Sequence, residues 1–145
     1  MNDNQLIFEA YLTENGEEPE VQILPNGDKI WRKDGRRHRE DGPAVELADG
    51  NRIWMQLGFK HRLDGPAFIS PEGYKAWWVN GKRHREDGPA VIHEDGGYDW
   101  YLNDRCLRME DWAEGVLKLH NKPSDPEAVK EFLRSILAKQ TKDLI

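Results

Sequence analysis

Three groups of side chains that could do chemistry recur in the middle of the chain. The pattern His-Arg-x-Asp begins at His38, at His61 and at His84, so the spacing is 23 residues each time. Histidine and aspartate can exchange protons or hold a metal ion, and an arginine beside them can bind phosphate or carboxylate oxygens. The chemistry open to these groups depends on whether the fold gathers them at one point or spreads them along a row.

The same spacing extends to the residues around these groups. Asp-Gly-Pro-Ala closes each pattern, and a tryptophan and two glycines recur in the same register. Coincidences at so many positions indicate an internal repeat, whose units bury apolar surface by stacking on one another. We assign the following residues to the structure of the repeat: Trp31, Trp54, Trp77, Trp100, Asp41, Gly42, Pro43, Asp64, Gly65, Pro66, Asp87, Gly88 and Pro89.

Each unit predicts two short strands joined by a turn. The β-prone run 45–47 precedes the turn residues Asp49 and Gly50, and a second β-prone run follows at 52–56. We therefore expect a mainly β protein, an antiparallel meander of repeated β-hairpins with about two strands per unit, capped by one or two C-terminal helices. Because neighbouring strands lie about 4.8 Å apart, equivalent residues of successive units should lie roughly 10 Å apart.

Rows at that spacing argue against an active site or a metal centre. Zinc takes about four ligands around one point, and acid–base catalysis needs unlike groups that converge. The sequence also has no G-x-S-x-G, phosphate-binding loop or His-Glu-x-x-His pattern. We predict no catalytic residue, no metal ligand and no cofactor, and we interpret the single cysteine, Cys106, as a small core residue.

The Asp-Gly-Pro corner offers a structural role for the same groups. Aspartate can cap backbone N–H groups, glycine can adopt a positive φ and proline fixes φ. In this interpretation the arginine pairs with an aspartate of its own or the next unit, and the histidine donates to a carbonyl at the corner. The functional alternative makes the rows, with two aromatic residues of the opposite face, a binding surface. Its candidate partner- or ligand-binding residues are His38, Arg39, His61, Arg62, His84, Arg85, Trp78 and Tyr101.

The ends of the chain differ from the repeat. We expect one domain over 1–145, with an acidic segment at 1–20, the repeat sheet at 21–108 and a helical cap at 109–145. The run 6–12 is compatible with a strand or a short helix. Helices are predicted from Asp111 and from Pro126, and the second should pack on the sheet or form a dimer contact. Its apolar stripe comprises Val129, Phe132, Leu133, Ile136 and Leu137.

Charge is unevenly distributed along the chain. The net charge is −6, residues 1–20 hold six acidic and no basic side chains, and the remainder holds 21 of each sign. The acidic segment is either a solvated start or an arm for a basic partner. The balance elsewhere argues against a nucleic-acid-binding protein. Without a long apolar run or a signal peptide, we expect a cytoplasmic protein with no membrane partner.

One unit carries a family resemblance. The run Trp-x-x-Asn-Gly-x-x-His-Arg-x-Asp-Gly-Pro-Ala, from Trp77 to Ala90, resembles a repeat of bacteriophage, giant-virus and bacterial proteins. It is similar to a variant of the MORN repeat, and the resemblance covers roughly residues 20–113. It implies short hairpins and an interaction module. The second unit departs from the pattern at 57–59, which read Leu-Gly-Phe, and the fourth lacks the histidine and Asp-Gly-Pro.

These observations predict a non-enzymatic repeat scaffold for protein–protein interaction. One form would be a phage-type, anti-defence inhibitor that docks on a host protein in the host cytoplasm. Rows of tryptophan, tyrosine and arginine suit such a role because these residues dominate interface hot spots. The alternative is a protein that sequesters an anionic small molecule, such as a nucleotide, between its arginines, histidines and tryptophans. An exposed apolar patch would favour a protein partner.

Overall fold

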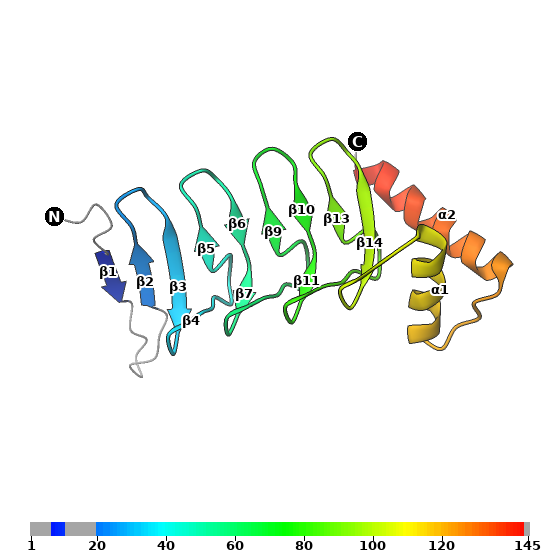
Figure 1. The fold of residues 1–145 in the computed structure, drawn as a ribbon, viewed down its shortest axis with the longest axis horizontal. Coiled ribbons are helices and arrows are strands. Elements are labelled where there is room, and N and C mark those ends of the chain that lie inside the picture. Colours follow the sequence, from blue (N-terminus) through cyan, green and yellow to red (C-terminus); the bar gives the residue numbers. More distant parts are fainter. Residues whose placement is uncertain (1–6, 11–19, 144–145) are drawn as a thin grey trace.

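The computed structural model of the protein describes residues 7–10 and 20–143. It is an elongated row of β-hairpins that ends in two helices on the C-terminal side (Figure 1). The expectation for the acidic segment falls largely outside the described residues, since Asp3, Glu14, Glu17 and Glu18 are not among them.

The hairpins join edge to edge into one long antiparallel path, which confirms the predicted meander. The strands follow the order β1-β2-β3-β5-β6-β9-β10-β13-β14-β15, and each pairs antiparallel with the next. Residues 7–10 are therefore a strand and not a helix. The bounds along this path are β1 Ile7–Ala10, β2 Glu20–Ile23, β3 Lys29–Lys33, β5 Val45–Glu46, β6 Arg52–Ile53, β9 Phe68–Ile69, β10 Lys75–Ala76, β13 Val91–Ile92, β14 Tyr98–Leu102 and β15 Arg105–Leu107.

Each unit also forms a second, shorter hairpin at its other end, which adds strands to the two expected. The main sheet is interrupted at Trp54 and at Trp77, whose N–H groups donate to the carbonyls of Ala67 and Ala90 at 2.7 Å. Beyond each tryptophan the chain turns back on itself. The additional strands are β4 Arg36–Arg37, which pairs with β3, β7 Met55–Gln56 with β8 Phe59–Lys60, and β11 Trp78–Val79 with β12 Lys82–Arg83.

The turns of these second hairpins require two consecutive residues in the left-handed region. Leu57 has φ 48° and Gly58 has φ 88°, and the equivalent pairs in the other units also have positive φ. Two central residues with positive φ are the mark of a type I′ turn, whose twist matches that of the flanking strands. The N–H groups in such a turn have no partner within the hairpin, so they are available to a neighbouring unit.

Successive units approach closely where each one begins. Ala44, Ala67 and Ala90 occupy the same repeat position and are fully buried. Val45 lies opposite both Ile30 and Ile53 in the sheet, so these side chains share one face. Together with Met55 they form a small apolar cluster within the array. Each unit thus buries its apolar residues against the next one, as expected for a repeat protein.

The two helices, α1 Met109–Leu119 and α2 Pro126–Asp143, close the C-terminal end of the array (Figure 1). Trp112 of α1 is fully buried and its ring centroid lies 4.6 Å from that of Trp100 in β14. The remaining members of this core come from both helices and the last hairpin: Leu102, Leu107, Met109, Ala113, Val116, Val129, Phe132, Leu133 and Ile136.

Two residues assigned to the core by sequence lie on the surface. Leu137 is 41% exposed, so the stripe of α2 packs only as far as Ile136. Cys106 is exposed, and its interpretation as a core residue was wrong. It lies in β15, the last strand of the path, opposite Tyr101 and not among the apolar residues that the helices cover.

Candidate functional site

The arginine of each His-Arg-x-Asp group lies flat over the tryptophan of its own unit. The guanidinium carbons of Arg39, Arg62 and Arg85 lie 3.9, 4.0 and 3.8 Å from the ring centroids of Trp31, Trp54 and Trp77. This is the geometry of a cation–π contact. The predicted rows of tryptophan and arginine therefore exist, and in each unit they contact one another.

The same arginines are bound to their own corner. The Arg85 Nε donates to Asp87 at 2.8 Å, and its Nη1 donates to the Pro89 carbonyl at 3.0 Å. The first two units repeat both bonds. In the second unit, the hydrogen bond from Arg62 holds the pKa of Asp64 below its ordinary value. The charge of each arginine is thus largely matched within its unit.

The histidines join each unit to the next one. Their Nδ1 atoms accept hydrogen bonds from backbone N–H groups 19 residues further on, all at 3.0 Å; the pairs are His38 with Leu57, His61 with Asn80, and His84 with Asn103. The expectation that histidine donates to a carbonyl at the corner was wrong. The donors are the first residues of the type I′ turns, whose N–H groups need a partner outside their own hairpin.

Two equivalent grooves lie between successive units. The first, of about 580 Å³, is lined by Trp54, Gln56 and the corner residues 39–43 and 61–64. The second, of about 560 Å³, is lined by Trp77, Val79 and the corner residues 62–65 and 84–87. Leu63 lines both grooves. Their polar groups are mostly the arginines and aspartates that already pair with each other.

A metal site needs several ligating side chains around one point. Among the described residues, no three histidine, cysteine, aspartate or glutamate side chains are placed to hold one metal ion. Glu86 accepts hydrogen bonds from Nε2 of His84 and of His120, both at 2.6 Å. Through this carboxylate, the third unit is joined to the end of α1.

Trp78 and Tyr101, the other two candidate binding residues, lie beside cations of the array. Lys60 Nζ lies 4.6 Å from the Trp78 ring centroid, and the Arg83 guanidinium carbon lies 4.3 Å from that of Tyr101. Arg83 also donates to the Tyr101 hydroxyl at 3.0 Å. Burial raises the pKa of this tyrosine. The aromatic pair is thus already covered in part by cations of its own array.

The second unit carries an exposed apolar residue at three positions where its two neighbours are polar or charged. Leu57, Phe59 and Leu63 are 45%, 59% and 81% exposed. We call these residues the apolar trio. The first and third units hold the following residues there, in the same order: Asp34 and Asn80, Arg36 and Lys82, and Glu40 and Glu86.

Two members of the trio lie on the groove face. Phe59 lies opposite Gln56 in its hairpin, and Gln56 and Leu63 both line the same groove. Sequence reasoning noted Leu57 and Phe59 only as departures from the repeat, and it did not single out Leu63. Comparison of each position with the first and third units would have found all three, because those two units are polar or charged there.

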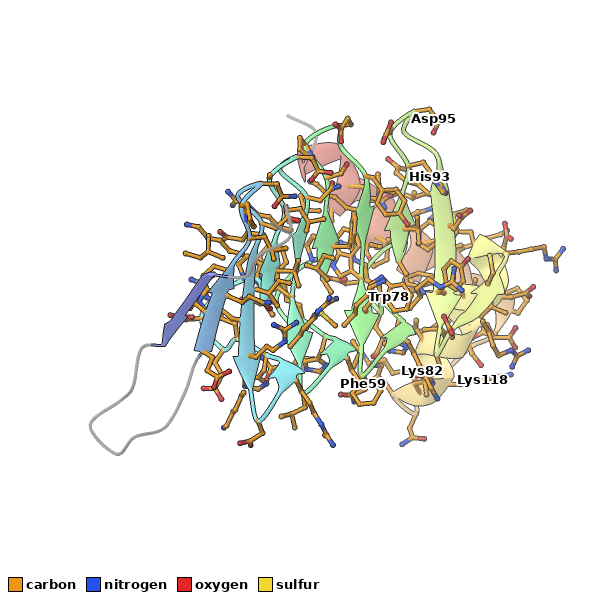
Figure 2. All side chains as sticks on the ribbon, turned by 60° about the vertical axis from the view of Figure 1, so that its left-hand side comes forward. Phe59, Trp78, Lys82, His93, Asp95 and Lys118 are labelled. Carbon is orange, nitrogen blue, oxygen red and sulfur yellow. The ribbon has the colours of Figure 1, made fainter. Side chains whose placement is uncertain are left out.

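The two long edges of the array carry opposite charge. We call the edge made by the short hairpins (residues 32–37, 55–60, 78–83 and 101–106) the hairpin edge. The loops 24–28, 47–51, 70–74 and 93–97 form the loop edge, which holds five carboxylates and no lysine or arginine. Figure 2 shows Phe59 and Lys82 at the hairpin edge and Asp95 at the loop edge. The hairpin edge carries eight cations against only Asp34 and Asp104; these cations are Arg32, Lys33, Arg36, Arg37, Lys60, Lys82, Arg83 and Arg105.

Two further findings concern the helices and the chain as a whole. Neither helix of the described part of the chain is long and apolar enough to cross a lipid bilayer. Comparison with protein-family models, with curated proteins and with solved structures finds no match to this chain.

Proposed function

We propose that the protein is a non-enzymatic scaffold that binds another protein, and that the apolar trio of the second unit is the centre of the docking surface. The observation that carries the proposal is that Leu57, Phe59 and Leu63 are exposed where the neighbouring units are polar or charged. The repeat itself is the reference, because the same local fold forms in those units without apolar side chains.

Leu57 adds a second argument. It adopts φ 48°, a conformation that suits glycine and asparagine and costs a leucine conformational energy. Its side chain is not buried, so the fold gains little in return. Strain without a structural benefit is typical of residues that act in binding.

The contacts of the arginines and histidines support this assignment, because these side chains already have partners within the array. The arginines of the three corners are stacked on tryptophans and paired with aspartates, and the histidines are bound to backbone N–H groups. Those rows therefore hold the scaffold together. The trio remains as apolar surface that a partner can cover, while contacts with the polar groups around it would exclude water from the rim of the interface.

The test is in-cell crosslinking and affinity capture with a variant that makes the second unit resemble its neighbours. Leu57→Asn, Phe59→Lys and Leu63→Glu introduce residues that the third unit already carries, so the fold should be retained, which circular dichroism checks. A protein captured by the natural chain should be lost, because each anchor contributes about 2 kcal/mol. The control variant, Tyr98→Lys with Leu119→Lys, removes exposed apolar side chains elsewhere and should retain the partner. Equal capture by all three proteins would refute the proposal.

A second candidate function is the sequestering of an anionic small molecule. The two grooves of similar volume at equivalent positions favour it, because a ligand could occupy both. Native mass spectrometry of protein gently purified from its own cells separates the two functions. A ligand of a few hundred daltons that is lost on changing Arg39, Arg62 and Arg85 would favour sequestering, whereas a bare chain or a bound protein would contradict it.

The repeat resembles one of phage, giant-virus and bacterial proteins that is similar to a variant of the MORN repeat, and this resemblance suggests one setting for the proposed function. In that setting, the protein is a viral inhibitor that docks on a host protein in the host cytoplasm. A partner identified by the capture experiment tests this directly, since it should be a host protein and not a second component of the virus.

A further inference from the structure

The hairpin edge combines free positive charge with the most exposed aromatic ring of the array. Arg36, Arg37, Lys82 and Arg105 form no ion pair with any described residue, in contrast to Arg83, which pairs with Asp104 at 2.9 Å. Three of these four lie within the first and third units, on either side of Phe59. The edge is therefore basic at its flanks and apolar in the middle.

Phe59 is fixed in place by the next unit. A Cβ atom built at Gly81 would lie 2.9 Å from the Phe59 Cδ1, so the ring rests directly against that turn. Glycine at this place leaves room for the ring. Arg36 and Lys82 occupy the position of Phe59 in the first and third units. Because equivalent positions of neighbouring units lie about 10 Å apart, one cation flanks the ring on each side. Figure 2 shows Phe59 and Lys82 projecting at the same end of the hairpins.

We propose that the partner docks on the hairpin edge through an acidic segment that carries apolar side chains. The inference rests on the proposed function and names the chemistry of the partner at the same site. Carboxylates on the partner would face the cations of the first and third units, and an apolar side chain between them would cover Phe59 and Leu57. Complementary charge sets orientation and association rate, and the central apolar contact supplies most of the affinity.

A nucleic acid is the rival occupant of a basic edge, and Phe59 distinguishes the two. Phosphate binding depends on the number of cations, so Phe59→Lys, which adds one, should strengthen it. An acidic segment anchored by apolar side chains should bind more weakly to the same variant, because the anchor is lost. The two occupants therefore predict changes of opposite sign for one substitution.

The experiment measures fluorescence anisotropy of three labelled probes with the full chain. The first probe is a synthetic glutamate-rich peptide with leucine and phenylalanine residues, the second has alanine at those apolar positions, and the third is a single-stranded oligothymidylate. The edge variant combines Arg36→Gln, Arg37→Gln and Lys82→Gln. Its matched control, Lys29→Gln with Arg52→Gln and Lys75→Gln, makes the same change in net charge at exposed residues next to the loop edge.

The first peptide should bind best. We expect its affinity to fall about tenfold or more in Phe59→Lys and in the edge variant, and to change less than about twofold in the control. Tighter binding to Phe59→Lys, equal binding of the alanine peptide, preferred binding of the oligonucleotide or no binding of the first peptide would each overturn the inference. Capture in cells that needs the apolar trio but ignores the edge variant would overturn it too, while leaving the proposed function intact.

Discussion

Trp54 in the array and Trp100 at the cap occupy the same position of the repeat, but they are covered in different ways. Arg62 stacks on the first and remains in contact with water, whereas Trp112 of α1 covers the second and buries it. In the fourth unit, the arginine of the repeat is Arg108, which pairs with Asp111 and has a side chain that is 80% exposed. At this position, a cation covers the ring in the array, and an apolar core covers it in the cap.

The comparison shows how one repeat position serves two purposes. A cation over a ring leaves a polar surface from which the next unit can continue, and it needs no additional layer. A tryptophan over a ring makes a closed core, and the meander stops there. The change from arginine to tryptophan cover coincides with the end of the array.

The largest expected effect comes from breaking the cap. Trp112→Ala removes a fully buried ring and the donor that Nε1 provides to the Arg85 carbonyl at 2.8 Å. We expect a loss of about 3–5 kcal/mol in the free energy of unfolding, measured by urea denaturation. Trp78→Ala, which removes a partly exposed ring beside Lys60, is the control and should cost clearly less. Similar losses for both would contradict the view that the cap holds the main core.

The next test concerns the cation cover of the array. Arg85→Ala removes the stack on Trp77 and two hydrogen bonds, so we expect a loss of about 1–3 kcal/mol. Arg108→Ala changes the equivalent residue of the fourth unit, where there is no stack, and should cost less than about 0.5 kcal/mol. Both values come from the same urea measurements. If the two losses are equal, the stacked arginines do not stabilise the array.

A third substitution should act in the opposite direction. Leu57→Asn places the residue of the third and fourth units in the left-handed turn position of the second. We expect the melting temperature to rise, with a gain of up to about 1 kcal/mol, because asparagine adopts this conformation more readily. The gain should come with weaker partner binding. A lower melting temperature would show that Leu57 contributes to folding, which would weaken its assignment to the docking surface.

The smallest effect should appear at the junction of array and cap. The pKa of Glu86 lies below its ordinary value of 4.5 because His84 donates a hydrogen bond to it, and His120 donates another. A carboxyl group whose pKa falls on folding stabilises the fold above its unfolded pKa, and this contribution is lost as the pH falls through the lowered folded value. The carboxylate is partly exposed, so the contribution should be about 0.2–1 kcal/mol.

The measurement compares urea unfolding of the natural protein and of Glu86→Gln between neutral and acidic pH. The variant should be less stable at pH 7, and the difference should shrink below about pH 4.5. A difference that stays constant with pH would mean that the charge of Glu86 does not join the cap to the array.

Much of the fold was predictable because the same turn and strand signals recur in each unit of the repeat. The turn signals at Asp49-Gly50 and their equivalents predicted the hairpins of the loop edge. The stripe up to Ile136 predicted the buried face of α2, but this face packs mainly on α1 and not on the sheet, as the stacking of Phe132 on Trp112 shows. The second hairpin of each unit was not predicted. Its strands are only two residues long in the middle units, which is too short for an alternating pattern. Leucine, as at Leu57, is also not a residue that type I′ turns favour.

The candidate site was less accessible from sequence. Residue types alone suggested that the histidines and arginines were free to bind, but their partners lie 2 to 19 residues away across a corner or a unit boundary. The exposure of the apolar residues could not be predicted from sequence either. Leu63 and Ile53 are equally apolar in the sequence, and only the fold shows that the first points to solvent while the second packs in the array.

The bonds from each histidine to the following turn have a consequence for how such a protein can change over generations. Each unit gives its successor the same acceptor and receives the same donor from it, so an in-frame duplication of one unit's codons would insert a complete unit without disturbing either end. Such an insertion beyond the second unit would move the apolar trio one step away from the cap. The distance between the proposed docking surface and the cap can therefore change over generations, but only in steps of one whole unit.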